Sequence, residues 1–312
     1  MHAADGDAAA TLKRLFDEVG RVVVGQQALL EGLLIGLLAG GHVLVEGVPG
    51  LAKTTAVRTL AQALGLGFRR VQFTPDLLPG DLVGTPVYHP DERRFAVRKG
   101  PIFTPVLLAD EINRAPAKVQ SALLEAMEER QVTIGDESFA LPLPFFVMAT
   151  QNPIEHEGTY PLPEAQIDRF LLKLVVGYPS AEEEHVIAVR DDADVSRVDA
   201  VADAVLVASM QRSASAVHVA DAVSDYAVRL VRRTREQRDV TVGASPRASR
   251  FLVRAAKARA LLDGRDFATP FDVKRTAPDV LRHRIVLSYE AEADGVRPEQ
   301  VVDAVLAAVE TP

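Results

Sequence analysis

One stretch of the sequence, from Val43 to Thr55, constrains the fold more than any other. It reads Val-Leu-Val-Glu-Gly-Val-Pro-Gly-Leu-Ala-Lys-Thr-Thr: a short apolar run, a loop containing glycine and proline, and the start of a helix. This order of strand, loop and helix is typical of a phosphate-binding loop, whose backbone amides and helix N-terminus attract polyphosphate. The alternative is a tight Gly/Pro turn between a strand and a helix.

The residue types in the loop favour phosphate binding. Gly47 and Gly50 let the backbone amides turn inward, because no Cβ is in the way. Lys53 lies at the positive end of a helix dipole, where a cation is unfavourable unless an anion binds nearby. The hydroxyl of Thr54 can coordinate Mg²⁺. We therefore expect ATP and Mg²⁺ here, with nucleotide contacts from Gly47, Val48, Pro49, Gly50, Leu51, Ala52, Lys53, Thr54 and Thr55.

Composition excludes several other classes of protein. The 312 residues carry a net charge of −8, which argues against a broad nucleic-acid-binding surface. The absence of cysteine excludes disulfides and thiolate metal sites and suits a reducing cytoplasm. The N-terminus does not have the pattern of a signal peptide, and the most apolar stretch, residues 28–45, is too interrupted to span a bilayer. We expect a cytoplasmic protein without membrane insertion.

Apolar runs alternate with helical patterns in the first part of the chain. The runs that predict strands lie at 43–45, 70–73, 106–109, 145–149 and 170–175. This alternation predicts a parallel sheet flanked by helices. Composition changes after Pro179, where Ser180 to Glu183 form a capping box and only helical patterns follow, with one possible short strand. We therefore expect a nucleotide-binding α/β core at 1–179 and an α-helical domain at 180–312.

Two β-hairpins are expected as insertions in the core. Residues 74–104 are rich in proline and glycine and alternate in polarity on both sides of a turn near His89. A second alternating segment occupies 131–141. So long a non-helical insertion is usually functional, although a surface loop is the alternative.

Polar residues that end apolar strands point to a catalytic constellation. Asp110 and Glu111 end one strand and Asn152 follows another. Ligands of open parallel sheets bind beyond the carboxyl ends of the strands, so these side chains should lie beside the phosphate loop. Asp110 would hold Mg²⁺, Glu111 would polarise water for attack on the γ-phosphate, and Asn152 would position that water. The alternatives are an acidic helix cap and a simple Asn-Pro turn.

Two arginines are further candidates. Arg169 precedes the last predicted strand, and Arg247 follows Ser245-Pro246, which read as the N-cap and first residue of a helix. A cation in the first helical turn favours a nearby anion. A surface position or a salt bridge is the alternative for each. The arginine-rich segment from Arg229 to Arg238 fits a solvated helix face or a subunit contact.

These motifs together resemble the MoxR family of AAA+ ATPases, and the resemblance covers nearly the whole chain. The residues that carry it are Gly47-Val-Pro-Gly-Leu-Ala-Lys-Thr, Gln72-Phe-Thr-Pro-Asp-Leu-Leu-Pro-Gly-Asp, Ala109-Asp-Glu-Ile-Asn-Arg-Ala, Ala149-Thr-Gln-Asn-Pro and Tyr160-Pro-Leu-Pro-Glu-Ala-Gln-Ile-Asp-Arg-Phe. The resemblance implies a P-loop NTPase AAA+ core with β-hairpin insertions and a C-terminal α-helical lid domain. Alanine at position 52, where the general pattern has glycine, is usual in that family.

The resemblance also implies roles for single residues. Lys53 and Thr54 match Walker A, and Asp110 and Glu111 match Walker B. Asn152 is similar to sensor 1, Arg169 to an arginine finger that reaches a neighbouring subunit, and Arg247 to the sensor 2 arginine of the lid. Gly25 and Gln26 lie where the family contacts adenine. The implied assembly is a hexameric homo-oligomer, a chaperone-like motor that partners von Willebrand factor A domain proteins and acts on a protein client.

Three other functions are compatible with parts of this pattern. A nucleic-acid motor is disfavoured by the acidic charge, and DNA-stimulated, salt-sensitive ATPase activity would indicate it. A metal-chelatase motor subunit has the same core and hairpins. A nucleotide switch that does not hydrolyse ATP is disfavoured by the intact Asp110-Glu111 pair.

Overall fold

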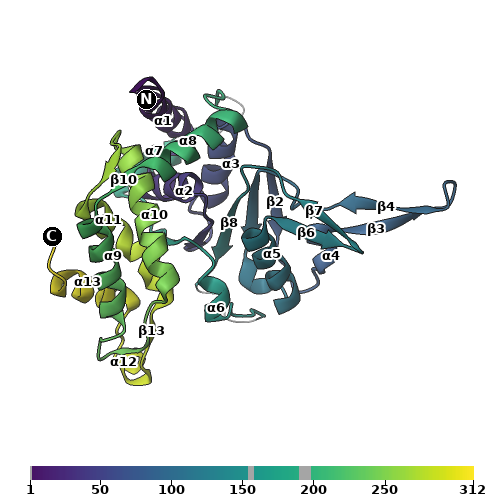
Figure 1. Ribbon diagram of the computed structural model, residues 1–312. Helices are drawn as coiled ribbons and strands as arrows, with labels where there is room; N and C mark the ends of the chain where they lie inside the picture. Colours follow the sequence, from purple (N-terminus) through teal and green to yellow (C-terminus); the bar gives the residue numbers. More distant parts are fainter. Residues whose placement is uncertain (1, 154–157, 190–197) are drawn as a thin grey trace.

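The fold is built around a five-stranded parallel sheet. The computed structural model describes residues 2–153, 158–189 and 198–312. The strand order is β2-β5-β8-β1-β9, and all neighbours run parallel (Figure 1). The strands are β1 (Val43–Glu46), β2 (Phe68–Gln72), β5 (Val106–Asp110), β8 (Phe146–Gln151) and β9 (Leu172–Val175). The predicted parallel sheet is confirmed, and β1, which leads into the phosphate loop, lies inside it.

Both faces of this sheet are buried, which explains the continuous apolar runs in the sequence. Along β1, Val43 and Val45 belong to one core cluster and Leu44 to the other, as the two-residue period of a strand requires. The helices of the core are α1 (His2–Gly20), α2 (Gln27–Leu38), α3 (Lys53–Ala63), α5 (Ala117–Glu129) and α6 (Glu164–Ile167), with a 3₁₀ turn at Ile112–Arg114. Helices α1, α2 and α3 cover the first cluster and α5 covers the second.

The two predicted hairpins are present. Strands β3 (Gly84–His89) and β4 (Arg94–Lys99) form a ribbon that projects from the body, and β6 (Gln131–Ile134) pairs with β7 (Glu137–Ala140) (Figure 1). The insertion before β3 is not wholly non-helical as expected, because Pro79–Val83 form the short helix α4. Pro79 fixes the first helical turn and Asp81 accepts from the backbone amide of Leu78, at 2.9 Å.

The C-terminal part of the chain is mostly helical. Its helices are α7 (Ala181–Val189), α8 (Ala204–Ala216), α9 (Asp221–Thr234), α10 (Pro246–Leu262), α11 (Pro270–Leu281), α12 (Tyr289–Ala293) and α13 (Pro298–Ala308), with a 3₁₀ turn at Arg282–Arg284. The capping box at the start of α7 is confirmed, since Ser180 and Glu183 exchange two hydrogen bonds. The boundary proposed at residue 179 stays a prediction, because the core cluster around α2 continues into α8 and α10.

The expectation of one short strand in this region was wrong. Strand β10 (His218–Val219) pairs with β12 (Phe267–Ala268), and β11 (Val240–Val242) pairs with β13 (Val286–Leu287). Strands of two or three residues are too short to show an alternating pattern, so the sequence does not reveal them.

The arginine-rich segment from Arg229 to Arg238 has the contacts of a solvated helix end. Arg229 pairs with Asp225 at 3.0 Å within α9, and Arg233 pairs at 2.9 Å with Glu236, just past the end of the helix. Such exposed pairs contribute little to stability. These contacts favour the solvated-face interpretation.

His42 joins α5 to the sheet through a fully used imidazole ring. Its Nε2 bonds the carbonyl of Met127 at 3.1 Å, and its Nδ1 accepts from the amide of Val147 at 3.0 Å. Burial lowers the pKa of His42 to about 4, with smaller lowering by Arg130 and Arg254. The ring is therefore neutral in the folded protein and structural in role.

His42 predicts a pH dependence of stability. Since the unfolded chain binds this proton near pH 6.5 and the folded chain only near pH 4, the contribution of His42 is present at neutral pH and is lost as pH falls. Lowering the pH from 7 to 5 is expected to cost about 2 kcal/mol through His42. Urea unfolding at both pH values measures this change in the free energy of unfolding. His42→Gln, which keeps a donor and an acceptor, should show a flatter dependence; equal slopes would contradict the assignment.

Candidate nucleotide site

The loop after β1 has the backbone of a phosphate cradle. Gly50 has a φ of 85°, and a Cβ at Gly47 would lie 2.9 Å from the carbonyl oxygen of Val176. Ala52, at the N-cap of α3, also has a left-handed φ of 54° and caps no amide with its side chain. Glycine is usual at this position because it adopts that φ without strain. The amides of the first turn of α3 remain available to an anion.

The cavity beside this loop gathers most of the predicted catalytic residues. Its volume is about 470 Å³, and it is lined by Pro49, Gly50, Leu51, Ala52, Lys53, Thr54, Thr55, Arg70, Asp110, Glu111, Thr150, Gln151 and Asn152. The two acids come from the end of β5 and Asn152 from the end of β8, which are neighbouring strands. The parallel sheet therefore brings Walker-type acids and the loop together, as the sequence predicts. Gly47 and Val48 precede this lining within the same loop.

Lys53 lies over the loop with its charge partly buried. Its ammonium group donates to the carbonyl oxygen of Gly47. Burial lowers the pKa of Lys53, and the charges of Asp110, Glu111 and Glu46 act in the opposite direction. A polyphosphate in the cavity would meet this cation together with the amides of the loop.

Asp110 is held in place from two sides. Its Oδ1 accepts from the Thr150 hydroxyl at 2.6 Å, and its Oδ2 accepts from the guanidinium of Arg70 at 2.6 Å. Asp110 and Thr54 line the same cavity and offer the hard oxygen ligands that Mg²⁺ prefers. In the described ranges, no three His, Asp or Glu side chains gather as a metal site. Thr54 and Asp110 are the residues here that would hold a magnesium ion together with the phosphates of the nucleotide.

The carboxylate of Glu111 is held through one of its two oxygens. Its Oε2 accepts from Gln72 at 2.7 Å and from Arg114 at 2.9 Å, whereas Oε1 has no hydrogen bond among the described residues. Its backbone has a left-handed φ of 58°, and its amide donates to the Thr150 hydroxyl at 2.9 Å. The carboxylate is thus oriented by two donors, with one oxygen left to accept a proton from water.

Four side chains that orient the acids were missed by sequence reasoning. They are Arg70, Gln72, Arg114 and Thr150. Arg70 and Gln72 alternate on β2, whose place beside β5 follows only from the strand order. The alternation of polar residues at the carboxyl end of β2 is the signal in the sequence that could have indicated them.

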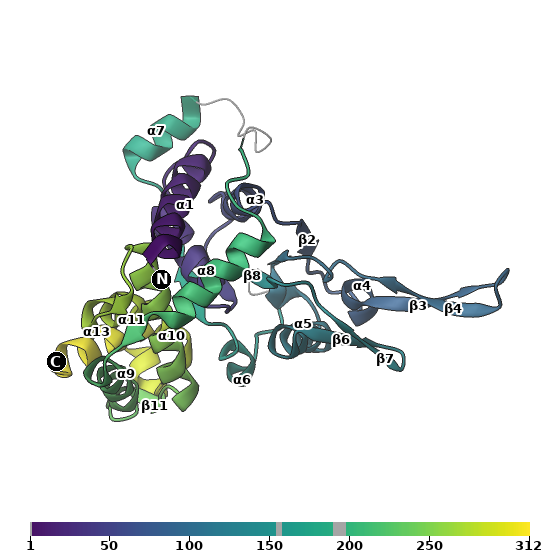
Figure 2. The same cartoon turned by 45° about the horizontal axis from the view of Figure 1, so that its top comes forward.

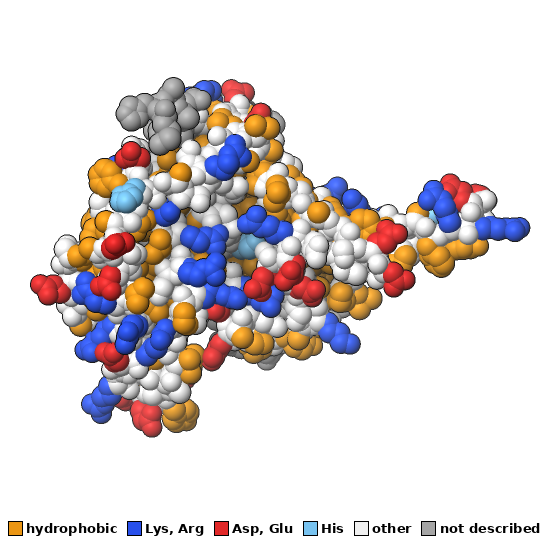
Figure 3. Space-filling view, in the orientation of Figure 1, with side chains coloured by type: hydrophobic (Ala, Val, Ile, Leu, Met, Phe, Trp, Pro, Cys, Tyr) orange, Lys and Arg blue, Asp and Glu red, His pale blue; other side chains and the backbone are white. Residues whose placement is uncertain are grey.

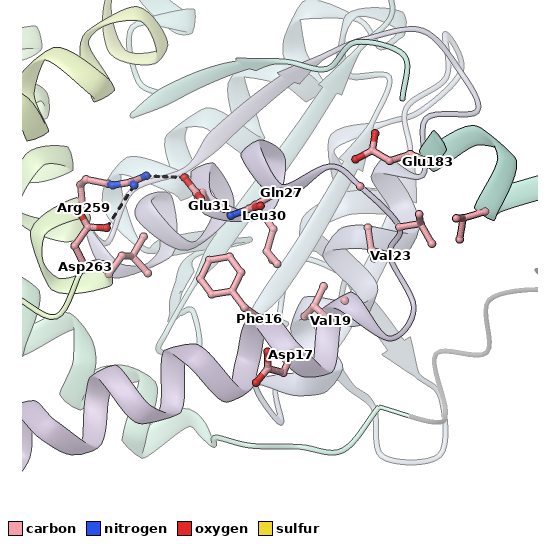
Figure 4. A pocket seen from close by; sticks show the side chains of 15 residues that line it. Phe16, Asp17, Val19, Val23, Gln27, Leu30, Glu31, Glu183, Arg259 and Asp263 are labelled. Atoms are coloured by element: carbon pink, nitrogen blue, oxygen red, sulfur yellow. Dashed lines mark hydrogen bonds and ion pairs between the residues drawn. The ribbon is translucent and has the colours of Figure 1, made fainter. Parts of the chain in front are cut away.

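Gly25 and Gln26 line other cavities, close to the loop. The Gln26 amide donates to the carbonyl of Gly177 at 3.4 Å, next to the Val176 that touches Gly47. Gly25 lines a cavity of about 780 Å³ between α1, α2, α7 and α10, where Arg259 bridges Glu31 and Asp263 at one end and Glu183 lies at the other (Figure 4). The adenine contact of Gly25 and Gln26 stays a prediction.

Arg169 and Arg247 do not line the phosphate cavity. They line a separate cavity of about 260 Å³, together with Arg130, Arg250 and Arg254. Glu128 joins them, at 3.2 Å from the Nε of Arg169 and 3.2 Å from an Nη of Arg247. Ser245 lies at the N-cap of α10 as predicted but bonds Asp168 instead of capping the helix. The structure therefore places both predicted arginines away from the phosphate loop of their own chain.

Comparisons with known proteins agree with this architecture. The model of the ATPase family associated with various cellular activities (AAA) matches residues 42–172, and that of the AAA lid domain matches residues 232–305. Chaperone MoxR1 of Mycobacterium tuberculosis is 51% identical, covering 97% of this chain and 82% of the relative. Protein MoxR of Methylorubrum extorquens is 33% identical, covering 98% and 96%.

A solved structure shows the same fold. The crystal structure of a candidate ATPase from Cytophaga hutchinsonii superposes with a TM-score of 0.92 at 45% identity, covering 99% of this chain and 97% of that one. Across residues 2–153, 158–189 and 198–312, no helix is both long and apolar enough to cross a membrane. Because a MoxR relative is 51% identical along almost all of this chain, the chain belongs to the MoxR family of AAA+ ATPases.

Proposed function

We propose that this protein hydrolyses ATP with Mg²⁺ in an oligomeric ring and uses the energy to remodel a protein client. One observation carries the proposal: Lys53, Asp110 and Glu111 meet in one cavity, while Arg169 lies in another. A subunit on its own thus has the groups for binding and water activation. Among the described residues, the arginine that lines this cavity is Arg70, and it holds Asp110.

Each residue of the cavity has a defined part in this chemistry. Lys53 and the loop amides bind the phosphates, and Thr54 and Asp110 hold the metal ion, which neutralises phosphate charge when bound. The free Oε1 of Glu111 accepts the proton of the attacking water. Asn152, from the neighbouring strand, orients that water.

The two arginines act on the nucleotide of a neighbouring subunit. Glu128 lies 3.2 Å from the Nε of Arg169, and no other carboxylate pairs with this arginine among the described residues. Arg247 lies beside it and is held by the same carboxylate. Both would approach a γ-phosphate of the neighbour when subunits assemble head to tail. The MoxR family resemblance implies that six subunits close the ring.

Remodelling of a client is supported by the relatives that carry the name chaperone or MoxR. The family resemblance implies a von Willebrand factor A domain protein as the partner. The compartment proposed for this protein is the cytoplasm. The projecting β3–β4 hairpin exposes Tyr88 and Phe95, whose ring centroids lie 5.2 Å apart. These two side chains are candidate contacts to the client or to neighbouring subunits.

Replacing Lys53 with alanine tests the nucleotide site. The loop would lose its only lysine, so we expect the affinity for Mg·ATP to fall by about tenfold or more and hydrolysis to be lost. Equilibrium binding of a fluorescent ATP analogue, with and without Mg²⁺, measures the first effect. Lys118→Ala, an exposed lysine on α5, is the matched control. Unchanged affinity in the Lys53 variant would place the triphosphate elsewhere.

A further inference from the structure

A groove with an apolar floor and a basic rim lies between the core and the C-terminal helices. Its volume is about 800 Å³, and its walls come from the ends of α2 and α5 and from α8, α9 and α10. Its apolar lining, called the floor below, includes Leu38, Val253 and Leu143, and Leu143 is 64% exposed. Figure 3 shows Lys and Arg side chains gathered in the middle of this face, beside the helices that form the groove.

The cations of the groove are not neutralised. Its basic residues are Arg130, Arg212, Arg250, Arg254 and Lys257. No acidic side chain lines it, and none of the five has a carboxylate partner in the portion of the chain that the structure describes. Arg130, Arg254 and Lys257 donate to carbonyl oxygens, which leaves their charges uncompensated. Burial, and then Arg130 and Arg250, lower the pKa of Arg254. In a chain of net charge −8, this groove favours an acidic partner.

Helix α7 has the complementary chemistry and a largely exposed surface. None of its nine residues, Ala181–Val189, is buried. Glu182 and Glu184 have no ion pair among the described residues, and Ile187 and Val189 are 47% and 72% exposed. Helix α7 lies beside α1 (Figure 2), and none of its described residues lines the groove of its own chain.

We propose that the groove receives helix α7 of a neighbouring copy of this chain. Glutamates at the start of α7 would pair with the basic rim, and its exposed apolar residues would cover the floor. The two surfaces differ and lie on separate parts of the subunit, so the contact is head to tail and can repeat around a ring. The proposal rests on the proposed ring. The groove adjoins the cavity of Arg169 and Arg247, with which it shares Gly40, Arg130, Arg250 and Arg254. Docking in the groove would therefore also bring Arg169 and Arg247 close to the neighbouring subunit.

A charge exchange tests this docking. The variant Arg212→Glu/Lys257→Glu should need about tenfold or more protein for half-maximal assembly with Mg·ATP, because two attractive contacts become repulsive. Adding Glu182→Arg/Glu184→Arg to the same chain should restore assembly. Sedimentation at several protein concentrations measures it, with thermal unfolding to verify the fold. Arg232→Glu/Arg238→Glu makes the same change of charge outside the groove and should leave assembly unchanged.

The outcomes separate the docking from the ring. A wild-type chain that assembles with ATP, together with a groove variant that assembles equally well, would overturn the docking and leave the ring standing. A groove variant that fails to assemble and is not restored by the α7 exchange would overturn α7 as the occupant. A wild-type chain that stays monomeric with Mg·ATP would overturn the ring and this docking with it.

Discussion

Replacing Arg169 with alanine is expected to lower ATP turnover by about 10³–10⁵-fold, the range that an arginine finger contributes. Binding of ATP should hardly change, because Arg169 does not line the cavity of its own subunit. Steady-state turnover and equilibrium binding on the same preparation separate the two effects. Lysine keeps the charge but not the two-pronged geometry, so Arg169→Lys should recover little.

The matched control for this variant is Arg232→Ala, an exposed arginine on α9 without an ion pair among the described residues. It should turn over ATP at the wild-type rate. Normal turnover by Arg169→Ala would remove this residue from the mechanism, and a loss of ATP binding would place it in its own subunit's site.

Replacing Glu111 with glutamine is expected to lower turnover by about 10²–10⁴-fold, the usual contribution of a general base. Glutamine has nearly the same size, but its amide cannot take the proton that Oε1 would accept. ATP should therefore bind and remain unhydrolysed, which a filter-binding assay with labelled ATP and a single-turnover experiment measure. Glu125→Gln, an exposed position on α5, makes the same change of charge away from the cavity. Rapid phosphate release by Glu111→Gln would assign water activation to another group.

The sequence predicts the parts of this protein that depend on local patterns. The loop from Gly47 to Lys53 and the acids at the end of β5 could be predicted, since each has a local pattern of residue types and parallel strands end at the same edge of a sheet. The left-handed φ of Ala52 could not be read from its side chain, because alanine is not typical of that conformation.

Contacts between distant segments could not be predicted. Arg70 orients Asp110 because β2 lies beside β5, and the sequence does not give that strand order. In the same way, Arg169 and Arg247 are far apart in the chain and share Glu128 only in the folded protein. Their position outside the phosphate cavity fits the arginine finger that the family resemblance implies for Arg169, and it extends the proposal about neighbouring subunits to Arg247.

Mixing two inactive variants tests most directly whether neighbouring subunits complete each other's sites. Glu111→Gln subunits keep Arg169, and Arg169→Ala subunits keep Glu111, so a mixed ring contains complete sites that neither variant forms alone. We predict that the co-assembled mixture regains ATPase activity well above that of either variant by itself. A mixture that assembles but stays as inactive as its components would contradict the account, because the arginine and the acid would then have to act in the same subunit.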